Sequence, residues 1–178
     1  MTAMQDRLGM SFQGTLAAVI PFFCALIGAI IANVPVSFSG GIVPPPLLAL
    51  MPVYYWCLVR PDLMPPFAAF TIGVLEDLLS GSPPGVWTLS FVAAYALVDR
   101  ERESFAGLAG VGAILGFAAA MLAAGATAYA IVAVYYWNMP PLGPIFIEIA
   151  VTVVFYIPVA ALLGWIHRHL IGSARSDL

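Results

Sequence analysis

Apolar residues occupy most of this chain in six runs, separated by short stretches rich in glycine, proline, serine or charge. Runs with so few ionisable residues are typical of transmembrane helices. The pattern predicts an all-α integral membrane protein with six transmembrane segments, at about residues 12–36, 42–59, 65–79, 86–98, 105–137 and 145–166. The third and fourth are short, roughly 20 Å as helices against about 30 Å for the hydrocarbon core. We expect them either to span a locally thinned bilayer or to enter it and return.

Prolines modify this pattern in the second segment. Pro44, Pro45 and Pro46 stand near its start, and Pro52 lies inside it. Proline removes a hydrogen-bond donor and interrupts a helix. We therefore expect this helix to be bent or to begin late.

Composition supports a membrane protein. The chain has 178 residues, of which 62% are hydrophobic and 8% charged, and its mean hydropathy is +1.01. A soluble domain carries about a quarter charged residues, so we expect one membrane domain over residues 1–178. A net charge of −3 without any lysine leaves no basic patch for nucleic acid. Cys24 and Cys57 lie in apolar runs and are interpreted as small buried side chains, with neither a disulfide nor a metal expected.

The arginines indicate the orientation of the chain. With six crossings, all of them fall on the side of the two termini: Arg7, Arg60, Arg100, Arg102, Arg168 and Arg175. The three opposite turns, at residues 37–41, 80–85 and 138–143, carry no charge. Because positive charge marks the cytoplasmic side, both termini are predicted to be cytoplasmic.

Three acidic residues interrupt the apolar segments on the other side. Glu76, Asp77 and Glu148 each lie about four residues from a turn, roughly 6 Å inward along a helix. No basic side chain is expected at that depth, so the acids must be protonated, hydrated, capped by backbone donors or paired with another subunit. Ordinary interfacial residues in contact with water are one interpretation. A structural or partner-binding site, together with the adjacent Pro84-Gly85 turn, is the other.

Small residues recur every four positions in the fifth segment, at Gly112, Gly116, Ala120 and Ala124. This spacing places them on one helix face, where another helix backbone can approach closely. Packing within the chain is the favoured explanation, and an oligomer interface is the alternative.

No catalytic, cofactor-binding or metal site is predicted. His167 and His169 are expected at the cytoplasmic end of the last segment, across most of the bilayer from the three acids. A Ser-His-Asp arrangement cannot form over that distance.

The region from Leu50 to Arg102 resembles the rod shape-determining protein MreD family. The resemblance is carried by Tyr55-Trp56, Arg60-Pro61, Gly73-Val74-Leu75-Glu76-Asp77-Leu78-Leu79-Ser80-Gly81, Pro84-Gly85-Val86-Trp87-Thr88-Leu89 and Tyr95-Ala96-Leu97-Val98. Asp77 and the Pro84-Gly85 turn match positions that the family pattern emphasises. Chain size and the six-segment layout also match.

The resemblance implies a non-enzymatic scaffold in the inner membrane of a bacterium, without a cofactor, that maintains rod shape as part of the cell-elongation machinery. Its implied partners are a bitopic MreC-like protein, the actin-like MreB, a membrane glycosyltransferase and a class B transpeptidase of peptidoglycan synthesis. The cytoplasmic face would present Arg60, Arg100 and Arg102. The implied fold is similar to the substrate-binding components of energy-coupling-factor transporters. That similarity supplies the alternative function, binding of a small molecule as a component of a vitamin-type transporter.

Overall fold

The computed structural model describes residues 19–34, 44–102, 104 and 110–171. All regular elements in these residues are helical, which confirms the predicted all-α class for the described part of the chain. The elements are the helix Val19–Ala32, α2 (Leu50–Val59), the 3₁₀ turn η2 (Pro61–Leu63), α3 (Pro66–Ser80), α4 (Val86–Arg100), α6 (Val111–Tyr136), α7 (Leu142–Ile166) and the π-helical turn η3 (His167–Ile171).

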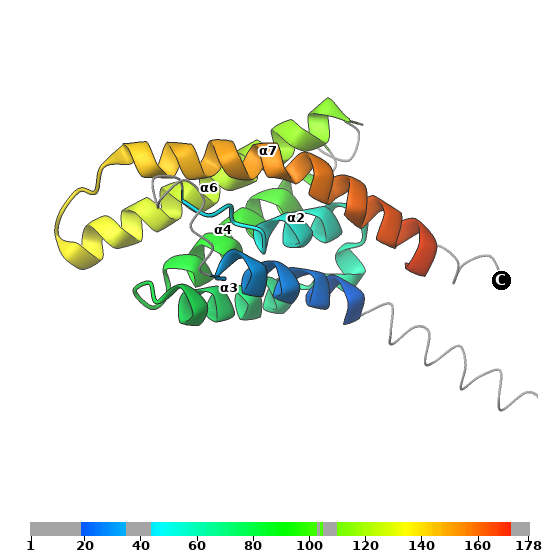
Figure 1. The fold of residues 1–178 in the computed structure, drawn as a ribbon, viewed down its shortest axis with the longest axis horizontal. Coiled ribbons are helices and arrows are strands. Elements are labelled where there is room, and N and C mark those ends of the chain that lie inside the picture. The colour runs from blue at the N-terminus through cyan, green and yellow to red at the C-terminus, as the bar shows by residue number, and fades with distance from the viewer. Residues whose placement is uncertain (1–18, 35–43, 103, 105–109, 172–178) are drawn as a thin grey trace, which may run out of the picture.

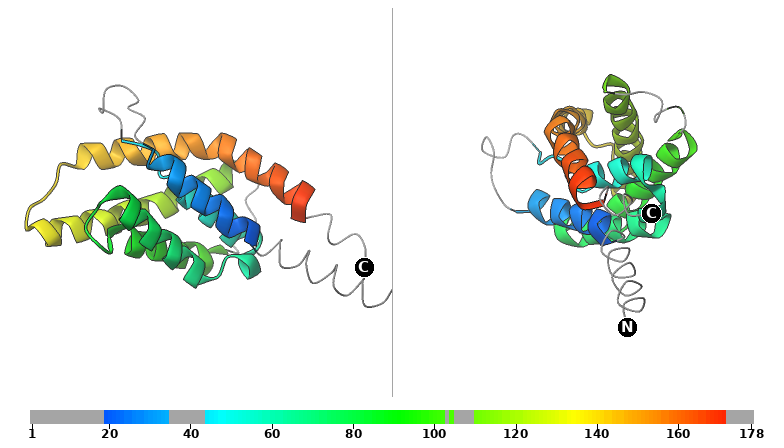
Figure 2. Two further views of the ribbon diagram at one scale, coloured as in Figure 1. Left: turned by 60° about the horizontal axis from the view of Figure 1, so that its bottom comes forward. Right: turned by 90° about the vertical axis from the view of Figure 1, so that its right-hand side faces the viewer.

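The helices lie lengthwise in an elongated bundle (Figure 1). Helices α6 and α7 form one antiparallel hairpin, α3 and α4 form another, and α2 contacts α4, α6 and α7 between them. The α3–α4 turn and the α6–α7 turn lie at the same end of the molecule, which we call the turn end (Figures 1 and 2). The α6–α7 turn extends farther than the α3–α4 turn in both views, so the shorter hairpin is recessed.

The second helix, α2, begins at Leu50 and not near residue 42, which confirms the late start expected from its prolines. The preceding described residues 44–49 do not form a helix. The three consecutive prolines supply no backbone N–H, and the first N–H after them, that of Leu47, donates to Thr152 Oγ1 of α7 at 3.1 Å. Pro52 is the third residue of the helix, where a backbone N–H has no intrahelical partner, so it is accommodated in the first turn.

Helices α3 and α4 begin and end within two residues of the ranges expected from the hydrophobic pattern. Each has 15 residues, a length of roughly 22 Å. Helices α6 and α7 have 26 and 25 residues and are the two described helices long and apolar enough to cross a membrane. Helix α7 starts at Leu142, three residues earlier than expected, because Pro144 fits in its first turn.

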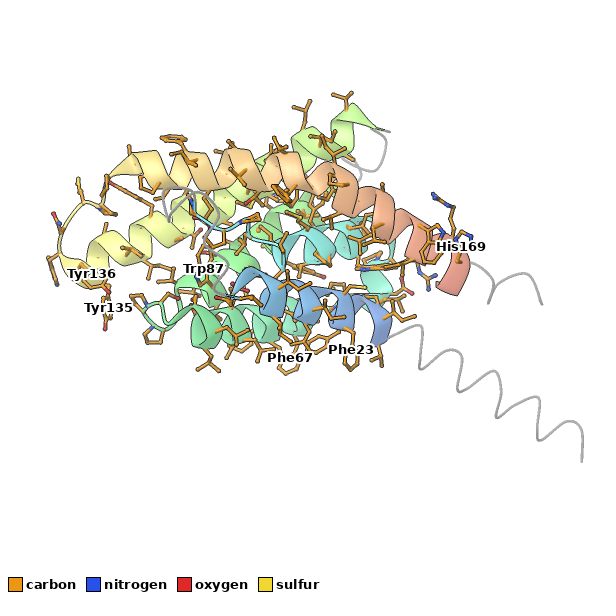
Figure 3. The ribbon with its side chains drawn as sticks, in the orientation of Figure 1. Phe23, Phe67, Trp87, Tyr135, Tyr136 and His169 are labelled. Atoms are coloured by element: carbon orange, nitrogen blue, oxygen red, sulfur yellow. The ribbon has the colours of Figure 1, made fainter. Side chains whose placement is uncertain are left out.

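The core lies around α2, whose residues are nearly all buried. Five large aromatic side chains there have no more than 2% of their surface exposed: Tyr54, Trp56, Phe91, Phe117 and Tyr156. The outer surface is also apolar, and Figure 3 shows Phe23 and Phe67 at its edge, 51% and 74% exposed. An apolar exterior around a packed core is the arrangement expected where lipid replaces water as the solvent.

Candidate functional site at the turn end

Asp77 lies in the last turn of α3 and caps the first turn of α4. Helix α3 ends at Gly81, whose φ of 64° is left-handed, and α4 begins after Gly85, whose φ is 96°. Glycine adopts these values without strain, so the chain reverses within five residues. Because Gly85 has no side chain, the N-cap residue itself cannot satisfy the free amides of α4. The carboxylate of Asp77 takes that role from the neighbouring helix.

Both carboxylate oxygens of Asp77 are used. Oδ2 accepts the backbone N–H of Gly85 at 2.9 Å and that of Thr88 at 3.1 Å, and also the Thr88 hydroxyl at 2.5 Å. Oδ1 accepts the Trp87 N–H at 2.7 Å and the Ser82 hydroxyl at 3.3 Å. A carboxylate at a helix N-terminus is stabilised by these donors and by the helix dipole. The acid therefore needs no basic partner.

Gly73 brings the two helices close enough for this contact. It lies four residues before Asp77, on the same face of α3. A Cβ atom on Gly73 would stand 2.6 Å from Thr88 Cα and 3.0 Å from the Trp87 carbonyl oxygen. The α4 backbone thus contacts α3 directly, one turn from the cap.

Glu76 points elsewhere and connects α3 to the first described helix. Its Oε1 accepts the Asn33 side-chain N–H at 2.7 Å, and the same amide nitrogen donates to the Ala29 carbonyl at 2.9 Å. Glu76 is only 3% exposed, and its Oε2 is buried without a hydrogen-bond partner. Sequence reasoning did not pair Asn33 with Glu76.

Glu148 lies at a cleft where α4, α6 and α7 meet. The cleft is lined by Trp87 of α4, Met121 and Ala124 of α6, and Ile145, Glu148 and Ile149 of α7, among others. Asp77, by contrast, is engaged with the first turn of α4 and does not line this cleft. In the turn, Gly85 donates to Asp77 and Pro84 is exposed.

The small residues expected to pack on one face of the fifth segment are all buried in α6: Gly112, Gly116, Ala120 and Ala124. Leu115, on another face, is 64% exposed. Helix α6 contacts α4, α7 and α2 within the chain. Packing inside the molecule accounts for this burial without a second subunit.

The arginines chosen from the sequence pair with nearby acids. Arg60 Nη2 lies 2.8 Å from Asp62 Oδ2, Arg102 Nη1 lies 3.8 Å from Asp99 Oδ1, and Arg100 Nε lies 4.0 Å from Glu101 Oε1. Such exposed pairs contribute little stability.

The two histidines lie far from the acids. The ring of His167 packs against Trp56, and that of His169 stacks on Trp165. Figure 3 shows His169 at the opposite end of the molecule from Trp87. Among the described residues, no group of three or more His, Cys, Asp or Glu side chains is placed to hold a metal ion.

Comparison with known proteins identifies the family. The family model of rod shape-determining protein MreD matches residues 12–166, nearly the whole chain. Comparison with curated proteins and with solved structures finds no match. The matched range includes α3, α4 and the turn that Asp77 holds together, and it extends through α7. The chain therefore belongs to the MreD family of rod shape-determining proteins.

Proposed function

We propose that this protein is a non-enzymatic membrane scaffold that helps to maintain rod shape by linking cytoskeletal and peptidoglycan-synthesis proteins. The family match supports a role in rod-shape determination. The observation that favours a scaffold is how the buried polar groups are used. Asp77 holds α4 to α3, Thr152 holds the segment before α2 to α7, and the Tyr95 hydroxyl donates to the Met64 carbonyl at 2.9 Å. These groups connect backbone segments and are not directed toward a substrate.

The proposed partners occupy two kinds of surface. A bitopic MreC-like protein contacts the apolar exterior within the bilayer, and through it a membrane glycosyltransferase and a class B transpeptidase are recruited. The actin-like MreB lies on the cytoplasmic side, at the end that carries Arg60, Arg100 and Arg102. Exposed apolar side chains on α6 and α7, such as Leu115 and Phe155, are available for a membrane-embedded contact. Lipid of the bilayer covers the rest of the apolar exterior.

The alternative, a small-molecule binder with the fold of energy-coupling-factor substrate-binding components, receives less support from the cavities. The space between α2, α4 and α6 does not admit a water molecule, and the cleft at Glu148 has about 20 Å³, room for about one water. Pockets for small molecules usually have about 300–1,000 Å³.

Co-purification tests the scaffold directly. The tagged protein, extracted in mild detergent, should retain an MreC-like bitopic protein encoded by the same host. Depletion of the protein should convert rods to rounded cells without affecting vitamin uptake. Retention of a vitamin-like ligand by the protein purified alone, with no bitopic partner, would contradict the scaffold and support the transporter component.

The proposed location is the bacterial inner membrane, with six crossings and both termini in the cytoplasm. This rests on the one-sided arginines and the uncharged opposite turns. Reporter fusions after Gly41, Gly85 and Gly143 should each report the periplasm. A cytoplasmic signal from any of them would refute this topology.

A further inference from the structure

The cleft at Glu148 has an unusual lining for a surface inside a membrane. Its floor is apolar and buried, formed by Met121 and Ala124. Its sides are half-buried residues, so the cleft opens at the surface of the bundle. Trp87 lines one side and Glu148 lines another. The cleft has room for about one water-sized group, about 20 Å³, so it admits the nitrogen of an alkylammonium group whose methylenes lie at the mouth.

Positive charge is missing around this cleft. Glu148 forms no hydrogen bond or ion pair within the described part of the chain, and Glu76 of α3 has a buried oxygen without a partner there. The sequence contains no lysine. The described arginines follow α2, α4 and α7, at the opposite end of these helices. Acidic groups at membrane depth are normally paired with a positive charge. Within the described residues, Glu148 has no such positively charged partner.

We propose that the cleft binds the ammonium group of a lipid whose headgroup carries a primary amine, such as phosphatidylethanolamine. The ammonium donates a charge-assisted hydrogen bond to Glu148 and lies against the face of Trp87. The inference does not depend on the scaffold role proposed above.

The position of the cleft favours a lipid headgroup over a side chain of another protein. Trp87 is the second residue of α4, directly after the polar turn Ser80–Gly85. That turn is recessed relative to the α6–α7 turn (Figure 2). On this side of the molecule the polar headgroup layer therefore meets the protein at the level of Trp87. A headgroup reaches the cleft there without entering the hydrocarbon.

Lipid selectivity of the purified full-length protein tests the proposal. Delipidated protein in detergent is given phosphatidylethanolamine or phosphatidylcholine with identical acyl chains, and bound lipid is measured by native mass spectrometry together with the unfolding temperature. Both lipids are zwitterionic, but the quaternary ammonium of phosphatidylcholine has no N–H to donate. We expect retention of phosphatidylethanolamine to be greater on the order of tenfold, as one hydrogen bond to a charged group provides.

Two variants assign the preference to the cleft. Glu148→Gln should reduce it to near equality, whereas Glu101→Gln, which removes the same charge at the end of α4, should leave it unchanged. Trp87→Leu, which keeps the backbone contact to Asp77, should weaken retention of both lipids, because the indole face attracts either ammonium, and it locates the site if Glu148→Gln does not fold. Equal retention of both lipids by the unmodified protein would overturn the proposal. A preference for phosphatidylethanolamine that survives Glu148→Gln would also overturn it. The same holds if Glu148→Gln leaves lipid retention unchanged and only causes loss of a co-purifying membrane protein.

Discussion

Replacing Asp77 with alanine should destabilise the protein more than any other single removal of an acidic side chain among the described residues. The carboxylate accepts three backbone N–H groups at the start of α4, from Gly85, Trp87 and Thr88. Alanine offers no acceptor, and the N-cap residue is a glycine that cannot replace it. The loss therefore falls on the first turn of α4 and on its contact with α3.

The size of the effect follows from the burial of each donor. The Thr88 hydrogen bond is buried, and an unsatisfied buried N–H costs about 1–3 kcal/mol. The N–H groups of Gly85 and Trp87 are partly buried, so water can replace the carboxylate as their acceptor. Losing these two hydrogen bonds should therefore lower the free energy of unfolding by about as much as losing an N-cap, about 0.5–2 kcal/mol. We expect a total of about 1.5–5 kcal/mol, a large share of the ~5–15 kcal/mol that typically stabilises a protein.

Thermal unfolding in detergent, followed by far-UV circular dichroism, measures this loss. Asp99→Ala is the matched control, because it removes the same side chain from the other end of α4, where Asp99 is exposed and only weakly paired with Arg102. Asp77→Asn keeps one acceptor oxygen and should lose less than Asp77→Ala. Glu76→Ala should also lose less, since it removes one hydrogen bond and the Asn33 amide still donates to a carbonyl.

Complementation of a depleted strain, at matched membrane levels, should follow the same order. An Asp77→Ala protein that unfolds at the temperature of the Asp99→Ala control, or that rescues rod shape fully, would refute the capping role.

Three further substitutions test the packing. Gly73→Ala should lower the amount of folded protein, because the new Cβ would stand 2.6 Å from the α4 backbone. Gly143→Ala is the control, since a Cβ there has no neighbour within 4 Å and should leave the amount unchanged. Equal yields of the two variants would contradict the close approach of α3 and α4. Gly116→Leu should reduce folded protein more than Leu115→Ala, as judged by size-exclusion chromatography, since only the former position is buried. Thr152→Val should cost about 1–3 kcal/mol in thermal unfolding by stranding the buried N–H that precedes α2, and an unchanged unfolding temperature would show that another acceptor is available.

The helices were largely predictable because hydrophobic runs and turn residues are local signals. Helices α3 and α4 lie within two residues of their predicted bounds, since Gly81 and Gly85 end and begin them within a short segment. The late start of α2 was expected from its three prolines, but the residue at which it begins was not. Hydropathy continues through residues 44–49, and only the contact with Thr152 on α7 shows where the chain leaves the helical conformation.

The site was predictable in its residue types but not in its connections. Sequence reasoning left four ways to satisfy Asp77, and the structure uses backbone donors of the next helix. Asn33 and Glu76 are 43 positions apart, and no spacing rule relates them, although both lie at the predicted outer side. The close approach at Gly73 was also missed. A repeated spacing indicated the small residues of α6, whereas a single glycine carries no such signal.

The Asp77 cap has a consequence for membrane insertion. The acid and its most distant donor are 11 positions apart, so both belong to one helical hairpin and enter the bilayer together. The charge and the free amides of α4 satisfy each other as soon as the hairpin closes, before any later helix has been synthesised. The bond from Leu47 to Thr152 joins positions 105 apart and has to wait for α7. The α3–α4 hairpin therefore enters the bundle with its polar groups already paired, whereas the non-helical segment before α2 is fixed last.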